Sequence, residues 1–277
     1  MASAERIGEG FFGAVYKVET GENEFEAHKK LGGELIFNNS WDSVNEMLAR
    51  EAKIYRDLQS DPSDKGLERI VRFIGVQDDP EHEFTDIERG TQALTLRMEY
   101  VERDLQAMTP HMEGCKWDDL KIRIMYEVAE GLELIHKKGY IHADLTFGNI
   151  LLTKDMHVKI CDFGISLKKG KTDLKRGGVE WPPEMQKDPP EYSYETDIWN
   201  FAVMMENLWE LSEMPHFVRM YIDQNMKVED MNQRDSATQV VNKLQDHLAL
   251  TSTKNNIKDL VRELESVTST HTLPETP

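Results

Sequence analysis

The stretch that decides the fold runs from Tyr140 to Gly164 and reads YIHADLTFGNILLTKDMHVKICDFG. Its apolar runs are Ile-His before Asp144, Ile-Leu-Leu after Asn149 and His-Val-Lys-Ile-Cys before Asp162, and each is typical of a short extended segment. The two acids and the amide therefore fall in loops between strands, where a rigid scaffold presents polar side chains. An acid, an amide five residues later and a second acid eighteen residues after the first can orient a hydroxyl and hold magnesium on a polyphosphate.

Length, charge and cysteine content restrict the class of protein. The chain has 277 residues, which allows one large domain or two lobes that share a cleft. Its net charge of −18 argues against nucleic acid and anionic membranes as partners. Cys115 and Cys161 are too few for a disulfide framework, and no apolar run reaches the length of a membrane span. We therefore expect no membrane insertion and an intracellular, cytoplasmic location, with the nucleus left open.

A glycine-rich segment lies near the N-terminus. Gly8, Gly10 and Gly13 interrupt the β-prone run AERIGEGFFGAVYKV over residues 4–18. Glycines allow backbone N–H groups to approach phosphates closely. The run continues as strand rather than helix, which excludes the dinucleotide-binding strand–turn–helix and predicts a glycine-rich hairpin.

A lysine and a glutamate are predicted to form a buried pair. In the strand FEAHKKL over residues 25–31, alternation places Lys29 on the apolar face and Lys30 toward solvent. Ser43 and Glu46 fit a capping box that opens a helix. Glu51 then lies in the middle of the apolar stripe of that helix, where a carboxylate needs a cationic partner, and Lys29 is the candidate.

The remaining segments give a coarse order of elements. We expect strands over residues 67–76 and 94–101, an acidic loop over 77–90 between them, a long amphipathic helix from Asp118 to Gly139, and a buried helix that starts at Asp197. A basic run follows Gly164 and is interpreted as a solvated loop. The chain is expected to be helical to about Glu265, and the polar tail over 266–277 to be disordered.

Over residues 4–265 the chain resembles a eukaryotic-type protein kinase catalytic domain, because a set of motifs occurs in the expected order. These motifs are the glycine-rich loop Gly8-Glu9-Gly10-Phe11-Phe12-Gly13-Ala14-Val15, Ala27-His28-Lys29, Glu51, Met98-Glu99-Tyr100-Val101, His142-Ala143-Asp144 with Asn149, Asp162-Phe163-Gly164, Pro182-Pro183-Glu184 with Arg234, and Asp197-Ile198-Trp199. The resemblance implies an α+β, bilobal fold. Its N-lobe, residues 1–101, would be β-rich with one helix and end in a hinge at 99–101, and its C-lobe, residues 102–265, would be mainly helical.

The resemblance also implies a role for each site residue. Asp144 would accept the hydrogen bond of the substrate hydroxyl, while Lys29 holds the α/β-phosphates and pairs with Glu51. Asn149 would be catalytic and, with Asp162, bind Mg²⁺. The implied ATP-binding residues are Ile7, Gly8, Glu9, Gly10, Phe11, Phe12, Gly13, Ala14, Val15, Ala27, Lys29, Met98, Glu99, Val101 and Leu151. Tyr55, Phe73, His142 and Phe163 would stack as the spine of the active state.

Short segments indicate a branch of the family. Gly-Phe-Phe-Gly at 10–13, Arg-Phe-Ile-Gly-Val at 72–76, Asp-Leu-Thr at 144–146 and Pro-Glu-Met at 183–185 are similar to the tyrosine-kinase-like group, especially its LIM-domain and testis-specific kinases. Asn-Phe-Ala-Val at 200–203 is similar to integrin-linked kinase.

Two cations of the family pattern are absent from the central stretch. Ala143 replaces the arginine that docks a phosphorylated activation loop, and Thr146 replaces the lysine that contacts the γ-phosphate in serine/threonine kinases. A missing cation of that kind can cost very roughly 10² to 10³ in rate. Lys168 or Lys169, which follow Asp162, are hypothesised to substitute.

Three functions fit these residues. The first is a protein kinase that transfers the ATP γ-phosphate to a protein hydroxyl, with serine/threonine or dual specificity favoured over tyrosine. The second is a nucleotide-binding pseudokinase or scaffold, which the missing cations suggest. The third is a small-molecule phosphotransferase, against which the intact Asp-Phe-Gly and the long activation segment argue. The sequence does not determine the physiological substrate, the regulation or the oligomeric state.

Overall fold

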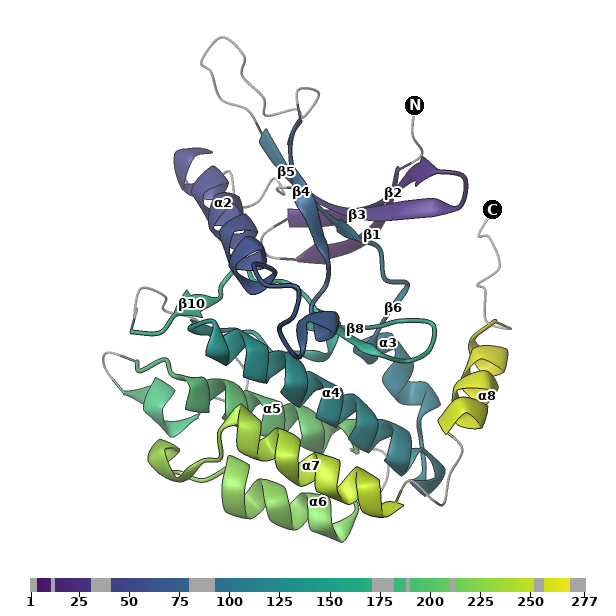
Figure 1. Ribbon diagram of the computed structural model, residues 1–277, viewed down its shortest axis with the longest axis vertical. Coiled ribbons are helices and arrows are strands. Elements are labelled where there is room, and N and C mark those ends of the chain that lie inside the picture. Colours follow the sequence, from purple (N-terminus) through teal and green to yellow (C-terminus); the bar gives the residue numbers. More distant parts are fainter. Residues whose placement is uncertain are drawn as a thin grey trace.

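The computed structural model describes residues 4–10, 13–30, 41–79, 93–170, 182–187, 190–209, 213–251 and 257–269. A β-rich N-terminal lobe lies above a mainly helical C-terminal lobe (Figure 1). The expected bilobal α+β fold is confirmed.

The N-terminal lobe is a five-stranded antiparallel sheet with one long helix against it. The strand order is β1-β2-β3-β5-β4, and the strands are β1 (Ala4–Gly10), β2 (Gly13–Gly21), β3 (Glu24–Lys30), β4 (Phe73–Asp79) and β5 (Ala93–Glu99). Helix α2 (Trp41–Leu58) packs on β4 and β5 and buries Leu48 and Ala52 with Leu96 of β5. The predicted glycine-rich hairpin is β1–β2, in which Gly10 pairs with Gly13.

Three boundaries in this lobe differ from the sequence prediction. The strand expected over 67–76 is wrong in its first half, because Gly66 has φ 84° and begins a 3₁₀ turn at Leu67–Arg69. Arg69 of that turn reaches Glu130 of the C-terminal lobe instead of joining the sheet. The strand expected over 94–101 ends at Glu99, and α2 begins at Trp41, two residues before the predicted start. The side chains that would form the predicted capping box at Ser43 lie outside the described set.

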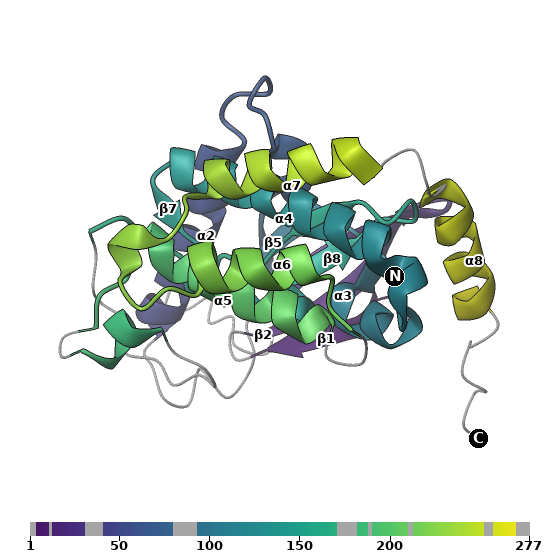
Figure 2. The same ribbon diagram turned by 90° about the horizontal axis from the view of Figure 1, so that it is seen from below.

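Helices α3 to α8 build the C-terminal lobe. They are α3 (Leu105–Met108), α4 (Asp118–Lys137), α5 (Tyr194–Leu208), α6 (His216–Tyr221, continued by a π turn over Ile222–Met226), α7 (Ala237–Thr251) and α8 (Ile257–Ser269). Figure 2 shows α7 lying along α4, and the buried faces of α4, α5 and α7 share one core. Not one helix in the described ranges combines the length and apolar character needed to cross a membrane.

Two helix boundaries in this lobe also differ from the prediction. Helix α5 starts at Tyr194 rather than Asp197, because Ser193 and Thr196 form its capping box. Helix α8 extends to Ser269, so the first four residues of the segment expected to be disordered are helical, and the last eight lie outside the described ranges.

The Tyr140–Gly164 stretch lies beneath the N-terminal lobe and contains the three short strands that its apolar runs predict. These are β7 (Tyr140–Ile141), β8 (Ile150–Leu152) and β9 (Val158–Ile160). Strand β8 lies between β9 and β6 (Arg103–Asp104), while β7 pairs with β10 (Leu167–Lys168). Short strands fixed on the long helix α4 therefore carry the loops that contain Asp144, Asn149 and Asp162.

Candidate active site

The side chain of Lys29 joins two carboxylates at the junction of the lobes. Its Nζ donates to both carboxylate oxygens of Glu51, at 3.0 and 2.9 Å, and to Oδ1 of Asp162 at 2.8 Å. Lys29 and Glu51 are 4% and 2% exposed. The predicted Lys29–Glu51 pair is confirmed, and the same ammonium links strand β3, helix α2 and the loop after β9.

Burial and charge act in opposite directions on these three groups. Burial by itself would lower the pKa of Lys29, but the Glu51 and Asp162 carboxylates raise it above its ordinary value. Burial raises the pKa of Glu51, which Lys29 only partly offsets. Burial also opposes ionisation of Asp162, yet the Lys29 ammonium lowers the pKa of that carboxyl below its usual range. Lys29 is thus held as a cation and Asp162 as an anion.

The backbone around Asp162 is held in an uncommon conformation. Asp162 has φ 61°, in the left-handed region that non-glycine residues seldom adopt. Its Oδ1 accepts from the Gly164 N–H at 3.1 Å, and its own N–H donates to the Tyr55 hydroxyl at 3.3 Å. A Cβ at Gly164 would lie 3.1 Å from Oδ1 of Asp162 and 3.5 Å from Nζ of Lys29. A side chain at that position would crowd the charged groups, which must shift by a few tenths of an ångström to accept it.

Asp144 and Asn149 are joined directly. The Asn149 amide donates from Nδ2 to the backbone carbonyl of Asp144 at 2.8 Å and to its Oδ2 at 3.1 Å. These bonds orient the Asp144 carboxylate from within its own loop and leave the Asn149 Oδ1 oxygen as an acceptor. The acid and the amide that the sequence placed five residues apart therefore form one unit.

A buried acid beneath this loop fixes its backbone. Asp197 of α5 accepts from the N–H groups of His142 at 2.8 Å and Ala143 at 2.9 Å, and its Oδ2 lies 2.8 Å from Nε2 of His136. Ala143 has φ 65°, so a non-glycine residue is held in the left-handed region directly before Asp144. In the sequence, Asp197 belongs to a helix motif, and nothing in its spacing indicates this role.

Four aromatic rings connect the two lobes behind the charged groups. Tyr55 stacks on Phe73 with centroids 5.4 Å apart, and Phe163 contacts Tyr55 edge-on at 4.9 Å and His142 at 5.1 Å. Phe163 is fully buried. The predicted stack is confirmed, and it fixes helix α2, strand β4 and the Asp162 loop relative to one another.

Apolar side chains from both lobes line the space beside Lys29. Ala27 and Met98 pair across β3 and β5, and Val15 and Leu151 pack against the same cluster from above and below. At the end of β5, the Glu99 backbone N–H donates to the Arg72 carbonyl at 2.8 Å, which fixes the start of the segment between the lobes. The other residues of the predicted nucleotide site lie on β1 and β2 (Ile7, Gly8, Glu9, Gly10, Gly13, Ala14) or directly after β5 (Val101), while Phe11 and Phe12 lie outside the described ranges.

The predicted pair between Glu184 and the distal Arg234 is also confirmed. Arg234 donates from Nη1 to Oε1 of Glu184 at 2.6 Å and from Nη2 to Oε2 at 2.8 Å. It further donates to the backbone carbonyls of Glu195 and Val228. The pair is almost fully buried, so it ties the segment before α5 to the body of the lobe.

Arg50 is a site residue that sequence analysis missed. It precedes Glu51 on α2, and its Nη2 donates to the Gly164 carbonyl at 3.1 Å. This bond is a second link between α2 and the loop of Asp162, beside the one through Lys29. No sequence pattern marks it, because an exposed arginine on a helix has many possible partners.

Lys168 and Lys169 do not lie where the hypothesis of a substitute cation requires. The Nζ of Lys169 lies 4.4 Å from the centroid of the Tyr194 ring on α5, and Lys168 acts on Asp57 of α2. Both contacts are with groups other than Asp144, Asn149 and Asp162, so the structure gives that hypothesis no support.

The oxygen atoms at this site suit a magnesium ion that is bound together with phosphates. The contacts of Asn149 and Asp162 leave an amide oxygen on the first and Oδ2 on the second, and hard oxygen ligands are those that Mg²⁺ takes. Within the described part of the chain, no group of three or more His, Cys, Asp or Glu side chains could hold a metal ion by itself. An ion here would therefore complete its shell with phosphate oxygens and water, which is the usual arrangement for Mg²⁺.

Comparisons with known proteins agree with this geometry. The family model described as the protein kinase domain matches residues 1–271. The serine/threonine-protein kinase CTR1 of Arabidopsis thaliana is 30% identical over 220 residues, which cover 76% of this chain and 24% of that protein. Mitogen-activated protein kinase 3 of the same organism is 28% identical over 208 residues, covering 73% of this chain and 51% of that protein. The insulin-like growth factor 1 receptor of Xenopus laevis is 27% identical over 222 residues, covering 76% and 15%.

The chain thus spans between about a quarter and a half of the first two of these relatives. The similarity to each relative therefore concerns that part of its length.

Proposed function

This chain belongs to the protein kinase domain family, and we propose that it transfers the γ-phosphate of ATP to a hydroxyl group of a protein substrate. The observation that carries the proposal is the junction at Lys29, where one buried ammonium contacts both Glu51 and Asp162. That junction occurs together with the Asp144–Asn149 unit and the completed aromatic stack. These contacts support the proposal because they bring together a lysine–glutamate pair, two acids and an amide, as such a transfer requires.

Residues of both lobes bind the ATP. Lys29, positioned by Glu51, binds the α/β-phosphates, and the β1–β2 hairpin covers them with backbone N–H groups. Val15, Ala27, Met98 and Leu151 enclose the adenine, which bonds to the backbone at 99–101 between the lobes.

Asp144 accepts a hydrogen bond from the substrate hydroxyl and so orients it toward the phosphate. Asn149 and Asp162 hold Mg²⁺, which neutralises negative charge on the phosphates when it is bound. Rigid positioning matters here because catalysis of phosphoryl transfer consists mostly of orientation and charge stabilisation.

We favour serine or threonine as the acceptor over tyrosine. Of the relatives described above, one is named a serine/threonine-protein kinase, one a mitogen-activated protein kinase and one a growth factor receptor. The first two names are the support for this preference. We also propose that the chain belongs to the tyrosine-kinase-like branch of the family and that it is located inside the cell, in the cytoplasm. Among the described residues, the Lys29 junction, the Asp144–Asn149 unit and the aromatic stack are all formed, which supports an active kinase over a scaffold without activity.

Transfer of labelled phosphate tests the proposal. The full chain is incubated with Mg²⁺, γ-labelled ATP and a peptide library that varies the acceptor hydroxyl and its flanking residues. Wild-type protein should label serine or threonine peptides, and Asp144→Asn should reduce the rate by at least a hundredfold. Equal labelling by wild type and Asp144→Asn would refute the proposal. Labelling of amino alcohols with no labelling of peptides would replace it with the small-molecule reading.

A further inference from the structure

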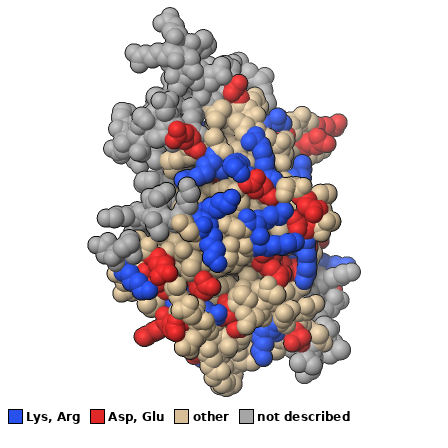
Figure 3. Space-filling model, turned by 60° about the vertical axis from the view of Figure 1, so that its left-hand side comes forward, with Lys and Arg blue, Asp and Glu red and all other residues tan. Residues whose placement is uncertain are grey.

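Six lysines gather on one face of this acidic protein, away from the nucleotide site. They are Lys53 on α2, Lys65 in the loop before β4, Lys137 and Lys138 at the end of α4, and Lys168 and Lys169 at the end of β10, and we call them the lysine face. Figure 3 shows blue side chains gathered in a band across this side of the molecule. Since the whole chain has a net charge of −18, this concentration of positive charge is a local exception.

Shared acidic partners hold most of the face together. Asp57 accepts hydrogen bonds from Lys53 and from the Tyr140 hydroxyl, each at 2.5 Å. These two bonds lower the pKa of Asp57, and the positive charge of Lys168 lowers it further. Lys138 donates to the Ser60 hydroxyl at 2.9 Å, which in turn donates to the carbonyl of Asp57.

The second acidic partner lies at the other end of the face. Lys137 and Lys138 both contact Asp64, at 2.7 and 2.6 Å. The lysines from α2 to the end of α4 therefore form one continuous surface.

The acids on this face leave positive charge unbalanced. Asp57 and Asp64 are each shared by at least two lysines, and Asp61 and Glu133 act on Lys138 and Lys137 from the edges. Lys65 lies 3.9 Å from Glu130, which also binds Arg69. Six lysines therefore face five carboxylates, one of which is shared with an arginine. The side chains of Lys53, Lys65 and Lys137 are 65%, 63% and 65% exposed, so their ammonium groups reach solvent.

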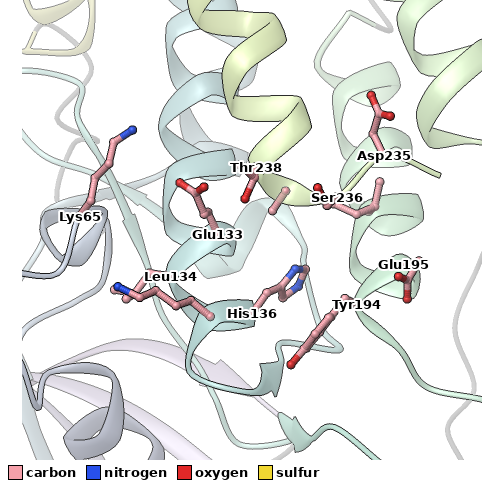
Figure 4. A pocket seen from close by; sticks show the side chains of 12 residues that line it. Lys65, Glu133, Leu134, His136, Tyr194, Glu195, Asp235, Ser236 and Thr238 are labelled. Carbon is pink, nitrogen blue, oxygen red and sulfur yellow. The ribbon is translucent and has the colours of Figure 1, made fainter.

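A pocket of about 360 Å³ opens at the edge of the lysine face, between α4, α5 and the start of α7. Lys65 and Lys137 line it together with Glu133, while Leu134, Ile198 and Ala237 supply apolar surface. Figure 4 shows Lys65 on one side of the opening and Glu195 and Asp235 on the other. The pocket has room for an apolar side chain whose flanking acidic residues would lie on the lysine side.

We propose that the lysine face and this pocket together dock an acidic segment of a protein substrate, with one apolar side chain of that segment in the pocket. As a substrate site, the proposal rests on the proposed function. The location permits it, because Tyr140 beneath Lys168 is four residues from Asp144, and four residues of chain span at most about 14 Å. A substrate chain can therefore continue from the Lys168 end of the docking surface to the Asp144 loop.

A protein segment fits these features better than a nucleic acid does. The pocket beside the lysines is lined in part by Leu134, Ile198 and Ala237, so it suits a ligand that combines acidic groups with an apolar side chain. A phosphate backbone has no apolar side chain to bury in this pocket, whereas a peptide can anchor itself there with one.

Peptide binding to the whole chain tests the docking surface without any catalytic step. The probe is a fluorescent peptide of about twelve Asp and Glu residues with one central Phe, and its Kd is measured by anisotropy at physiological salt. The test variant is Lys53→Gln/Lys65→Gln/Lys137→Gln, and the matched control is Lys116→Gln/Lys154→Gln/Lys243→Gln, which removes the same charge elsewhere. The variant Thr238→Trp, at the exposed first turn of α7, narrows the pocket mouth.

The proposal expects the test variant to weaken binding at least tenfold and the control to change it by less than twofold. It also expects a fivefold or greater loss from Thr238→Trp and from a peptide with Ser in place of Phe. Equal Kd values for the two triple variants, equal binding of the Phe and Ser peptides, or no saturable binding to wild type would each overturn it.

A kinetic arm separates this proposal from the proposed function. The acidic segment is joined to a peptide that the enzyme phosphorylates, and it should lower KM for wild type and for the control variant but not for the test variant. Phosphorylation without any such change in KM refutes docking and leaves the proposed function intact. Specific binding without any phosphate transfer refutes the proposed function and leaves the docking surface intact.

Discussion

Replacing Lys29 by methionine should lower the free energy of unfolding by about 3–5 kcal/mol at neutral pH. The ammonium of Lys29 contacts two carboxylates within 3.0 Å in a site where Lys29 and Glu51 are nearly inaccessible to solvent. Methionine fills a similar volume but leaves Glu51 and Asp162 as neighbouring anions without a counter-charge. The cost of breaking a buried pair from one side is in this range because the remaining charge is neither solvated nor paired.

The loss should depend on pH with a definite sign. Without Lys29, burial and mutual repulsion hold the pKa values of Glu51 and Asp162 above their values in the unfolded chain. The folded variant then binds more protons than the unfolded chain, so its stability is greatest at low pH and is lost as pH rises through the folded pKa values. The gap between wild type and variant should therefore widen between about pH 5 and pH 8.

Urea unfolding followed by circular dichroism at several pH values measures the effect. The double variant Lys29→Met/Glu51→Gln should recover about 2 kcal/mol, because only Asp162 remains charged and its side chain is 32% exposed. Lys154→Met, at an exposed loop position, is the control and should change stability by less than about 0.5 kcal/mol. A cost below about 1 kcal/mol with no dependence on pH would show that the junction at Lys29 is not formed as described.

Three further predictions follow from single contacts. Arg50→Gln should lower kcat about fivefold with little change in KM for ATP, because the bond from Arg50 to the Gly164 carbonyl contributes about 1 kcal/mol to positioning the loop. Arg50→Lys should retain most of the activity. Equal loss of kcat in both variants would contradict this. Arg234→Met should lower the free energy of unfolding by about 3–5 kcal/mol in thermal or urea unfolding, because it leaves the Glu184 carboxylate buried and unpaired; a loss below about 1 kcal/mol would be the contrary result. The Arg97 guanidinium lowers the pKa of Glu26 to about 2, so the stability that Glu26 contributes is full above about pH 5 and is lost as pH falls toward 2. The difference in free energy of unfolding between wild type and Glu26→Gln should shrink by roughly 1 kcal/mol between pH 6 and pH 3.5. An unchanged difference would refute this prediction.

The sequence was most informative where local periodicity and short offsets determine the geometry. Alternation along β3 placed Lys29 inward, and the apolar stripe of α2 placed Glu51 on its buried face, so their pairing could be predicted across 22 residues. The short strands of the central stretch could be predicted because each is a brief apolar run bounded by polar residues.

Prediction was weaker where a distant contact overrides local preference. The run over 67–76 contains several strand-forming residues, yet its first half turns because Gly66 adopts a left-handed conformation and Arg69 pairs with Glu130 on α4. The start of α5 was placed three residues late, since its capping box uses Ser193 and Thr196 rather than the acid at 197.

By itself, the sequence predicted which groups come together at the candidate site, because residue type and offset indicate the Asp144, Asn149 and Asp162 set and its lysine–glutamate partner. Only the tertiary structure decided how these groups are held. Asp197 fixes the loop before Asp144, Arg50 bonds to the Gly164 carbonyl, and Lys168 and Lys169 turn away from the site toward a separate basic face. The physical reason is that these contacts join residues tens of positions apart, and long polar side chains have many possible partners until packing selects one.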